Sequence, residues 1–310
     1  MRVAAIISVP QSNAVSSGNA GDVIPGPIVS WDVLGQSILS RVVDRLRVFG
    51  VSEISVLPDE TMPWPADEAQ KASAAWESTV ARYLGYGLKT LLLLRMGAYV
   101  EFDVTDFLRF HGETSKAVTR VCGQHQAHDV FAIEASRLQA CLVPVLQNEA
   151  SSRYPLSGYS NPLHDVRDFR QMVRDALWGR AAIRPIGKEI AANIWVDDGA
   201  RVDSTRVRGP AYIGRDSRVH SECAISGSTS VERQCEIDYG TSIDDCSILP
   251  RTYVGMGLSV RNAVASEDRL FHLRRNVQLH FHDRRLMGAV AMEHGLQRYS
   301  RALMGSFPGE

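Results

Sequence analysis

The sequence lacks several features that mark common classes of protein. Its 34 Lys and Arg side chains balance 35 Asp and Glu side chains, so the formal net charge is only −1. The strongly basic composition of many nucleic-acid-binding proteins is therefore missing, and we expect no nucleic-acid partner. No apolar run approaches the roughly 20 residues that a membrane-spanning helix needs. We accordingly expect a cytoplasmic protein that does not engage a membrane.

Cysteine is scarce, and the cysteines are not spaced as pairs. The five cysteines are Cys122, Cys141, Cys223, Cys235 and Cys246, an odd number with no C-x-x-C pair. This pattern argues against both a disulfide framework and a structural zinc site. We expect reduced, buried thiols, no metal site and no required cofactor.

The first 190 residues alternate between strand and helix patterns. Strands are expected at 3–9, 54–57, 90–94, 117–121 and 130–133, and helices at 33–49, 67–84 and 165–178. The 3–9 run after Arg2 is also compatible with a minimal signal peptide, but a strand buried on both faces explains it equally well. Strands that alternate with helices predict a three-layer α/β unit with a parallel sheet.

From about residue 196 the helical period gives way to a period of six. Ile213, Val219, Ile225, Val231, Ile237 and Ile243 follow one another at six-residue intervals, and Ile248, Val254 and Val260 continue after one five-residue step. An aliphatic residue at every sixth position predicts a hexapeptide-repeat left-handed parallel β-helix over 191–265, with these side chains inside a triangular prism. Residues 266–310 should form an extension, with a strand at 277–281 and a terminal helix at 286–303.

Several segments in the first unit stand in a recognisable order. They are Val3–Val9 with the small-residue loop after it, Pro25-Gly26-Pro27, Gly35-Gln36-Ser37 with the helix that follows, 91–97, 102–111, and Gly158-Tyr159 with 165–179. This order, followed by a β-helix, resembles the nucleotide-sugar pyrophosphorylases, also called sugar-1-phosphate nucleotidyltransferases. The resemblance implies a Rossmann-like nucleotidyltransferase domain over 1–190, with a nucleotide bound at the loop after the first strand.

The candidate nucleotide-binding loop departs from the family in its charged residues. Its candidate contacts are Gln11, Ser16, Ser17, Gly18 and Gly21, and no Lys or Arg occurs between Arg2 and Arg41. The family's Pro-Lys-Pro lysine aligns with Gly26, and its metal-binding aspartate aligns with Gly97. Transfer at a nucleotide phosphate depends on such charges, so we predict no catalytic residues and impaired activity. Mg²⁺ would be needed only if residual activity exists.

The predicted function is therefore a nucleotidyltransferase-like protein of nucleotide-sugar metabolism. It would bind a nucleotide or nucleotide sugar, serve in regulation, or act as a non-catalytic subunit. We also expect a homo-oligomer that forms through the β-helix or the extension. One alternative is a hexapeptide-repeat acyltransferase that uses His220, the only histidine of the repeats, although an outward-facing surface histidine is the simpler interpretation. A structural assembly protein is a further alternative. His280 and His282 could share a metal, but a solvated strand face explains them as well.

Overall fold

The computed structural model describes residues 2–10, 26–62, 74–114, 116–123, 126–138, 152–203 and 206–290. The helices are α1 (Ile38–Val48), α2 (Ala74–Gly85), α3 (Val104–Glu113) and α5 (Val166–Leu177). The strands of the first half are β1 (Val3–Val9), β2 (Asp32–Val33), β3 (Gln36–Ser37), β4 (Glu53–Pro58), β5 (Thr90–Arg95), β6 (Tyr99–Val100), β7 (Val118–Cys122), β8 (Ala127–Glu134), β9 (Ser152–Pro155) and β10 (Ser160–Asn161).

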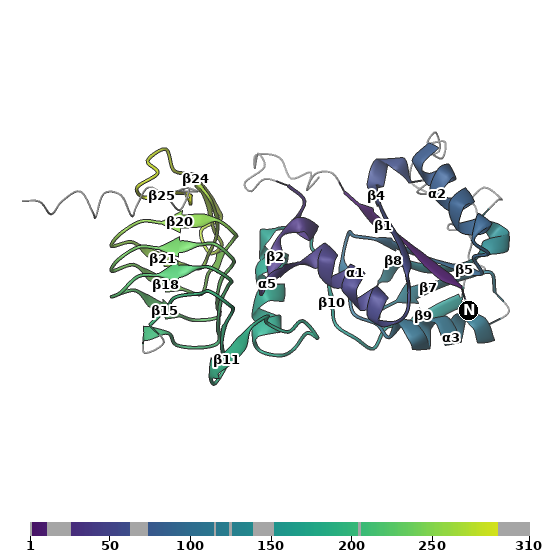
Figure 1. The fold of residues 1–310 in the computed structure, drawn as a ribbon, viewed down its shortest axis with the longest axis horizontal. Helices are drawn as coiled ribbons and strands as arrows, with labels where there is room; N and C mark the ends of the chain where they lie inside the picture. The colour runs from purple at the N-terminus through teal and green to yellow at the C-terminus, as the bar shows by residue number, and fades with distance from the viewer. Residues whose placement is uncertain are drawn as a thin grey trace, which may run out of the picture.

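A six-stranded sheet with the order β4-β1-β5-β8-β7-β9 forms the centre of the first half. Along β1, Ala4 and Ile6 face the hydrophobic cluster that includes Trp76 and Tyr83 of α2, whereas Ala5 and Ile7 face the cluster that includes α1 and α3. Because both faces of the strand are buried, its sequence is a continuous apolar run. The predicted three-layer α/β arrangement is therefore present, with helices on both faces of the sheet (Figure 1).

The prediction of a parallel sheet is confirmed for the three strands on which it rested, but the sheet as a whole is mixed. Strands β4, β1 and β5 are parallel, but β8 runs antiparallel to both β5 and β7. Only residues 123–126 connect β7 to β8. A connection this short allows a hairpin but not the crossover that parallel neighbours require.

Helix α1 begins later than the apolar spacing suggested. Val33 belongs to the β2–β3 hairpin, whose turn places Leu34 at φ 54° and Gly35 at φ 101°. The Ser37 hydroxyl then caps the helix by accepting the backbone N–H of Ser40. The expected helix 67–84 is described only from Ala74 onward, because residues 63–73 lie outside the described residues.

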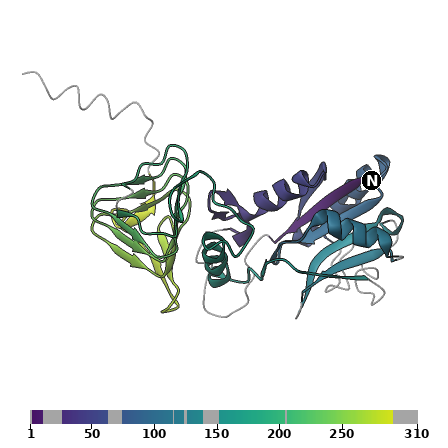
Figure 2. The same ribbon diagram turned by 90° about the horizontal axis from the view of Figure 1, so that it is seen from below.

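The second half is a coil of short strands that form three sheets. The strands are β11 (Lys188–Ala191), β12 (Ile194–Val196), β13 (Ala211–Ile213), β14 (Arg218–Val219), β15 (Ala224–Ser226), β16 (Thr229–Val231), β17 (Glu236–Ile237), β18 (Ser242–Asp244), β19 (Ser247–Ile248), β20 (Thr252–Val254), β21 (Ser259–Arg261), β22 (Ala263–Ser266), β23 (Arg269–His272), β24 (Val277–His280) and β25 (Met287–Ala289). From β12 to β19 each strand pairs in parallel with the strand one coil later; for example, Ala224 pairs with Ser242, which in turn pairs with Ser259. We call this part the solenoid (Figures 1 and 2).

The six-residue pattern correctly identified the interior of the solenoid. The predicted inward-facing residues Ile213, Val219, Ile225, Val231, Ile237, Ile243, Ile248, Val254 and Val260 are all buried in one cluster. The corners between them adopt left-handed backbone conformations in three series: Asp216, Gln234 and Arg251; Glu222, Gly240 and Gly257; and Gly227, Asp245 and Asn262. Each series advances by 18 and then by 17 residues, because the five-residue step from Ile243 to Ile248 shortens one coil. The handedness of the coil stays a prediction.

Of the two predictions made for the C-terminal extension, one is confirmed and the other is wrong. Strand β24 forms at 277–280, as the alternating pattern indicated. The helix expected from residue 286 was wrong at its start, because Met287–Ala289 is strand β25, paired antiparallel with β20. Met287 is buried against the last coil, which explains why extended backbone is favoured there. Residues 291–310 lie outside the described residues.

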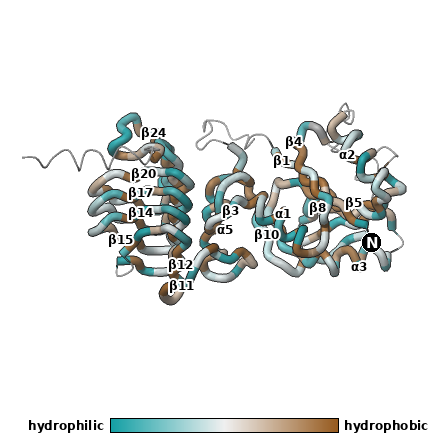
Figure 3. Tube along the Cα trace, in the orientation of Figure 1, coloured by the Kyte–Doolittle hydropathy of each residue, from teal (hydrophilic) through white to brown (hydrophobic). Residues whose placement is uncertain are grey.

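The α/β part and the solenoid share a buried interface. Figures 1 and 2 place α5 between the six-stranded sheet and the solenoid. Tyr212, Leu249 and Val264 of the solenoid are part of the same hydrophobic cluster as the α/β part. Figure 3 shows hydrophobic residues along central strands such as β5 and β8. Since one core crosses residue 190, the limits 1–190, 191–265 and 266–310 remain predictions.

Candidate functional site

The carboxyl ends of the parallel strands are the natural place for a nucleotide in an α/β sheet. The five predicted contacts there, Gln11, Ser16, Ser17, Gly18 and Gly21, all lie outside the described residues. Their role therefore stays a prediction. The described residues at this edge nevertheless show which charges a ligand would meet.

Asp59, directly after β4, and Arg95, the last residue of β5, form a close ion pair at this edge. The Arg95 Nε lies 3.1 and 3.0 Å from the two carboxylate oxygens of Asp59, and its Nη2 lies 2.6 Å from Oδ2. The hydroxyl of Ser8, in β1, also donates to Asp59. The bidentate geometry commits the Asp59 carboxylate to the protein itself. Sequence reasoning missed this pair, because nothing in the spacing of residues 59 and 95 reveals it.

The ion-pair network continues across the sheet. Arg95 Nη1 lies 3.8 Å from Oδ2 of Asp129 in β8, and Arg120 Nη2 of β7 lies 2.6 Å from Asp129 Oδ1. Two arginines thus face two aspartates. We call Asp59, Arg95, Asp129 and Arg120 the edge network. It carries no net charge, so it adds little attraction for the phosphates of a nucleotide.

The edge network does not fit a magnesium ion. Both of its carboxylates accept from arginines, whereas a Mg²⁺ site needs carboxylates directed at the ion. Among the residues that the structure describes, no group of three or more His, Cys, Asp or Glu side chains could hold a metal. Gly97, predicted to stand where the resembled family has its metal-binding aspartate, leaves open space: a Cβ built there meets no heavy atom within 4 Å.

The other family-like motifs are used for internal contacts. Gly35 packs against the solenoid, where a Cβ would lie 2.4 Å from the Tyr212 hydroxyl. The backbone N–H groups of Leu34 and Gly35 donate to the two carboxylate oxygens of Glu232, at 3.0 and 2.9 Å. These contacts hold the start of α1 against the solenoid.

His220 lies on the outer side of the solenoid, directly after β14, which belongs to the sheet formed by β14, β17, β20 and β25. Its Nε2 lies 3.0 Å from Glu236 Oε1, and its side chain is 34 % exposed. Nearby, the Tyr253 hydroxyl donates to Asp238 Oδ2 at 2.7 Å, which lowers the pKa of Asp238. A histidine held by a carboxylate can act as a general base, although the same pair also occurs on ordinary surfaces.

Among the described residues, His280 and His282 make contacts on the C-terminal extension, and the cysteines are free thiols. His280 Nε2 lies 2.9 Å from Asp268 Oδ2, and its ring contacts that of His282 edge-on, with 4.7 Å between centroids. Cys223, Cys235 and Cys246 are buried and Cys122 is half-buried, all with free thiols, as predicted; Cys141 is outside the described residues. Burial raises the pKa of the Cys235 and Cys246 thiols to about 12, so they are unreactive at neutral pH.

Comparisons with known proteins give a distant similarity. No family model matches the chain. A bifunctional protein GlmU of Pelobacter propionicus is 24 % identical over 160 residues, which are 50 % of this chain and 31 % of that protein. The matched segment therefore spans less than a third of the relative. None of the helices in the described part of the chain has the length and apolar character that a bilayer crossing requires.

Proposed function

We propose that this chain is a nucleotidyltransferase-like protein of nucleotide-sugar metabolism that binds a nucleotide or nucleotide sugar without turning it over. The distant similarity to the bifunctional protein GlmU supports a nucleotidyltransferase-like role. The observation that carries the loss of catalysis is the edge network. Where the family resemblance implies a metal-bound phosphate site, this chain has Gly97 and a neutral set of ion pairs.

The proposal predicts ligand binding without catalysis. Wild-type protein mixed with Mg²⁺, any common nucleoside triphosphate and a hexose 1-phosphate should release no measurable pyrophosphate. A turnover number in the ordinary range of roughly 1–1000 per second would overturn the loss of catalysis. In thermal-shift measurements, a bound nucleotide sugar at 100 times its dissociation constant should stabilise the fold by about 2.7 kcal/mol. If no nucleotide or nucleotide sugar shifts the midpoint, the binding proposal fails.

Gly97→Asp tests whether the metal position has been placed correctly. The open space around Gly97 accepts a side chain, and its backbone φ is not positive. We expect Mg²⁺ to tighten nucleoside-triphosphate binding by the variant but not by the wild type. Gly112→Asp, on α3 and also in open space, is the matched control. Equal Mg²⁺ dependence in the wild type and both variants would show that the alignment of residue 97 is wrong.

A second candidate, acyl transfer, is favoured by the His220–Glu236 pair. In this function His220 would remove the proton of an attacking hydroxyl or amine, and Glu236 would orient the ring. Activity with acyl-CoA that falls at least about a hundredfold in His220→Ala would support it, because general-base catalysis contributes roughly that much. The absence of any acyl transfer would leave His220 as a surface residue.

A further inference from the structure

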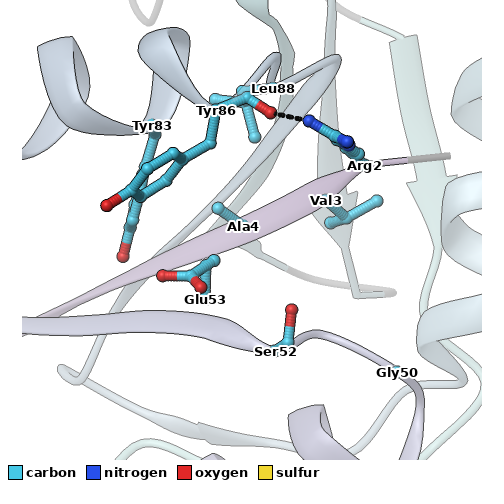
Figure 4. Close-up of a pocket in the computed structure, with 9 residues that line it drawn as sticks. All are labelled: Arg2, Val3, Ala4, Gly50, Ser52, Glu53, Tyr83, Tyr86 and Leu88. Atoms are coloured by element: carbon cyan, nitrogen blue, oxygen red, sulfur yellow. Dashed lines mark hydrogen bonds between the residues drawn. The ribbon is translucent and has the colours of Figure 1, made fainter.

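A pocket of about 390 Å³ lies at the amino-terminal end of β1. It is at the opposite edge of the six-stranded sheet from the edge network, since Arg2, Val3 and Ala4 line it while Ser8 lies near the other end of the strand. Figure 4 shows β1 crossing the site, with Tyr83, Tyr86 and Leu88 on one side of the strand in this view and Glu53, Ser52 and Gly50 on the other. The resemblance to nucleotidyltransferases assigns nothing to this end of the sheet.

The inner wall of the pocket is apolar and fixed in place. Ala4, Tyr83 and Leu88 are 2 %, 1 % and 9 % exposed. The Tyr83 hydroxyl lies 2.6 Å from Ser55 Oγ and donates to the backbone carbonyl of Ala5 at 3.3 Å. Because two contacts hold the hydroxyl of this buried side chain, the pocket wall does not depend on a ligand to form.

Two opposite charges line the pocket. Among the described residues, neither Arg2 nor Glu53 belongs to an ion pair. Arg2 Nη1 donates to the backbone carbonyl of Tyr86, and a neutral carbonyl leaves the positive charge uncompensated. In Figure 4 the Val3–Ala4 segment separates Arg2 from Glu53. The pocket therefore offers an anion-binding end and a separate hydrogen-bond-accepting end.

The rim adds groups that suit a polyhydroxylated ring. The Tyr86 side chain is 56 % exposed and offers an aromatic surface for C–H groups, and Ser52 is exposed beside Glu53. A guanidinium binds phosphate strongly, and a carboxylate accepts hydrogen bonds from sugar hydroxyls. The volume falls within the range of small-molecule sites.

We propose that this pocket binds a sugar phosphate, with the phosphate at Arg2 and the sugar hydroxyls at Glu53 and Ser52. The site is separate from the nucleotide edge, so it stands or falls independently of the proposed function. It would give the protein a second ligand, recognised at the end of the sheet where no nucleotide is expected.

Isothermal titration calorimetry of the full chain with glucose 6-phosphate and glucose 1-phosphate tests the proposal. We expect saturable binding of at least one of them at one site per chain. Arg2→Gln should weaken it at least about tenfold, since a charge-assisted hydrogen bond is lost. Glu53→Gln should weaken sugar-phosphate binding but leave binding of inorganic phosphate unchanged. The matched controls are Arg109→Gln and Glu113→Gln, on α3 and exposed, which should bind like the wild type.

Each contrary result overturns the proposal in a distinct way. No saturable binding of either sugar phosphate excludes the ligand class. Equal affinity for inorganic phosphate shows a simple anion site, and preferential binding of an amino acid shows a zwitterion site. Binding that survives Arg2→Gln places the ligand elsewhere, for example at the nucleotide edge. Circular dichroism of both variants excludes unfolding as the cause of lost binding.

Discussion

At the scale of single residues, two buried carboxyl groups lie between the α/β part and the solenoid. Glu232 is fully buried and accepts the N–H groups of Leu34 and Gly35, and Asp32, 2 % exposed, pairs with Arg233 at 3.1 Å. Burial, with Asp32 nearby, raises the pKa of Glu232 to about 7, and burial also raises the pKa of Asp32. The half-buried Arg41 guanidinium opposes both shifts. The fold therefore favours the protonated forms of Glu232 and Asp32.

The raised pKa of Glu232 predicts how stability changes with pH. Because the folded pKa, about 7, exceeds the ordinary glutamate pKa of 4.5, the folded state binds the proton more tightly. This contribution to stability is fully present below about pH 4.5 and is lost as the pH rises through 7. We expect the free energy of unfolding to fall by up to about 3 kcal/mol from this group between pH 4.5 and 8.

Urea unfolding across this pH range, compared between wild type and Glu232→Gln, measures the effect. The amide of the variant, like the protonated carboxyl, has one carbonyl oxygen to accept the N–H groups, so the variant should be close to the wild type at low pH and should show a flatter pH dependence. Glu113→Gln, an exposed change on α3, should keep the wild-type slope. An unchanged slope in Glu232→Gln would show that another group, such as Asp32, takes up the proton.

At the scale of elements, α5 is attached to a corner of the solenoid by charge. Arg170, whose side chain is 1 % exposed, lies 2.8 Å from Asp245, and Arg174 pairs with the same carboxylate. Arg170 also donates to the backbone carbonyl of Ser228, and Trp178 Nε1 donates to Ser228 Oγ at 3.0 Å. Burial lowers the pKa of Arg170 to about 10, which still leaves it charged at neutral pH. A single carboxylate therefore compensates a buried cation at this interface.

Asp245→Asn should weaken the attachment of α5. Asparagine tolerates the left-handed conformation at this corner, φ 54°, so the substitution removes the charge with little backbone strain. Leaving Arg170 buried without its partner should cost about 3–5 kcal/mol of unfolding free energy in denaturant titrations. Asp244→Asn, the adjacent change at a carboxylate that accepts from the Ser226 hydroxyl, should cost much less. Similar losses in both variants would mean that the buried charge is not what holds α5.

The alternation of inward and outward residues predicts contrasting effects within one strand. Ile225 is fully buried in the solenoid, whereas its neighbour Ala224 in β15 is exposed. Ile225→Asp buries an unpaired carboxylate and should prevent folding of the solenoid, because the penalty of several kcal/mol is comparable with domain stability. Ala224→Asp should be tolerated. Arg233 would be a poor outward control despite its exposure, since it pairs with Asp32. Equal damage in both variants, judged by circular dichroism, would refute the six-residue register.

At the scale of the whole molecule, the described surface leaves a sheet edge exposed. Strand β24 ends the eight-stranded sheet, and its Val277 and Leu279 are 42 % and 43 % exposed. We predict self-association through this part of the extension, because exposed apolar edges favour pairing between chains. Light scattering at micromolar concentration should give a closed oligomer rather than the 34.2 kDa monomer. The surface variant Val277→Lys with Leu279→Lys should shift it toward monomer. An oligomer unchanged by these substitutions would place the interface elsewhere.

The sequence alone determined those features that depend on local pattern. The buried runs of β1 and β5, the capped helix α5 and the inward residues of the solenoid follow from hydrophobic periodicity, which adjacent residues largely decide. The absence of a lysine or arginine between Arg2 and Arg41 and the glycines at 26 and 97 are likewise visible in the sequence.

Only the tertiary structure decided which distant side chains meet. Asp59 and Arg95, and Arg170 and Asp245, are far apart in the chain but form ion pairs, whereas Arg2 and Glu53 line one pocket without pairing. No periodicity of the sequence links the members of these sets. The antiparallel direction of β8 depended on its short connection to β7. The strand β25, in place of the expected helix, depended on pairing with β20 at the last coil of the solenoid. These outcomes arise from long-range pairing and burial, which compete with local propensity and can override it.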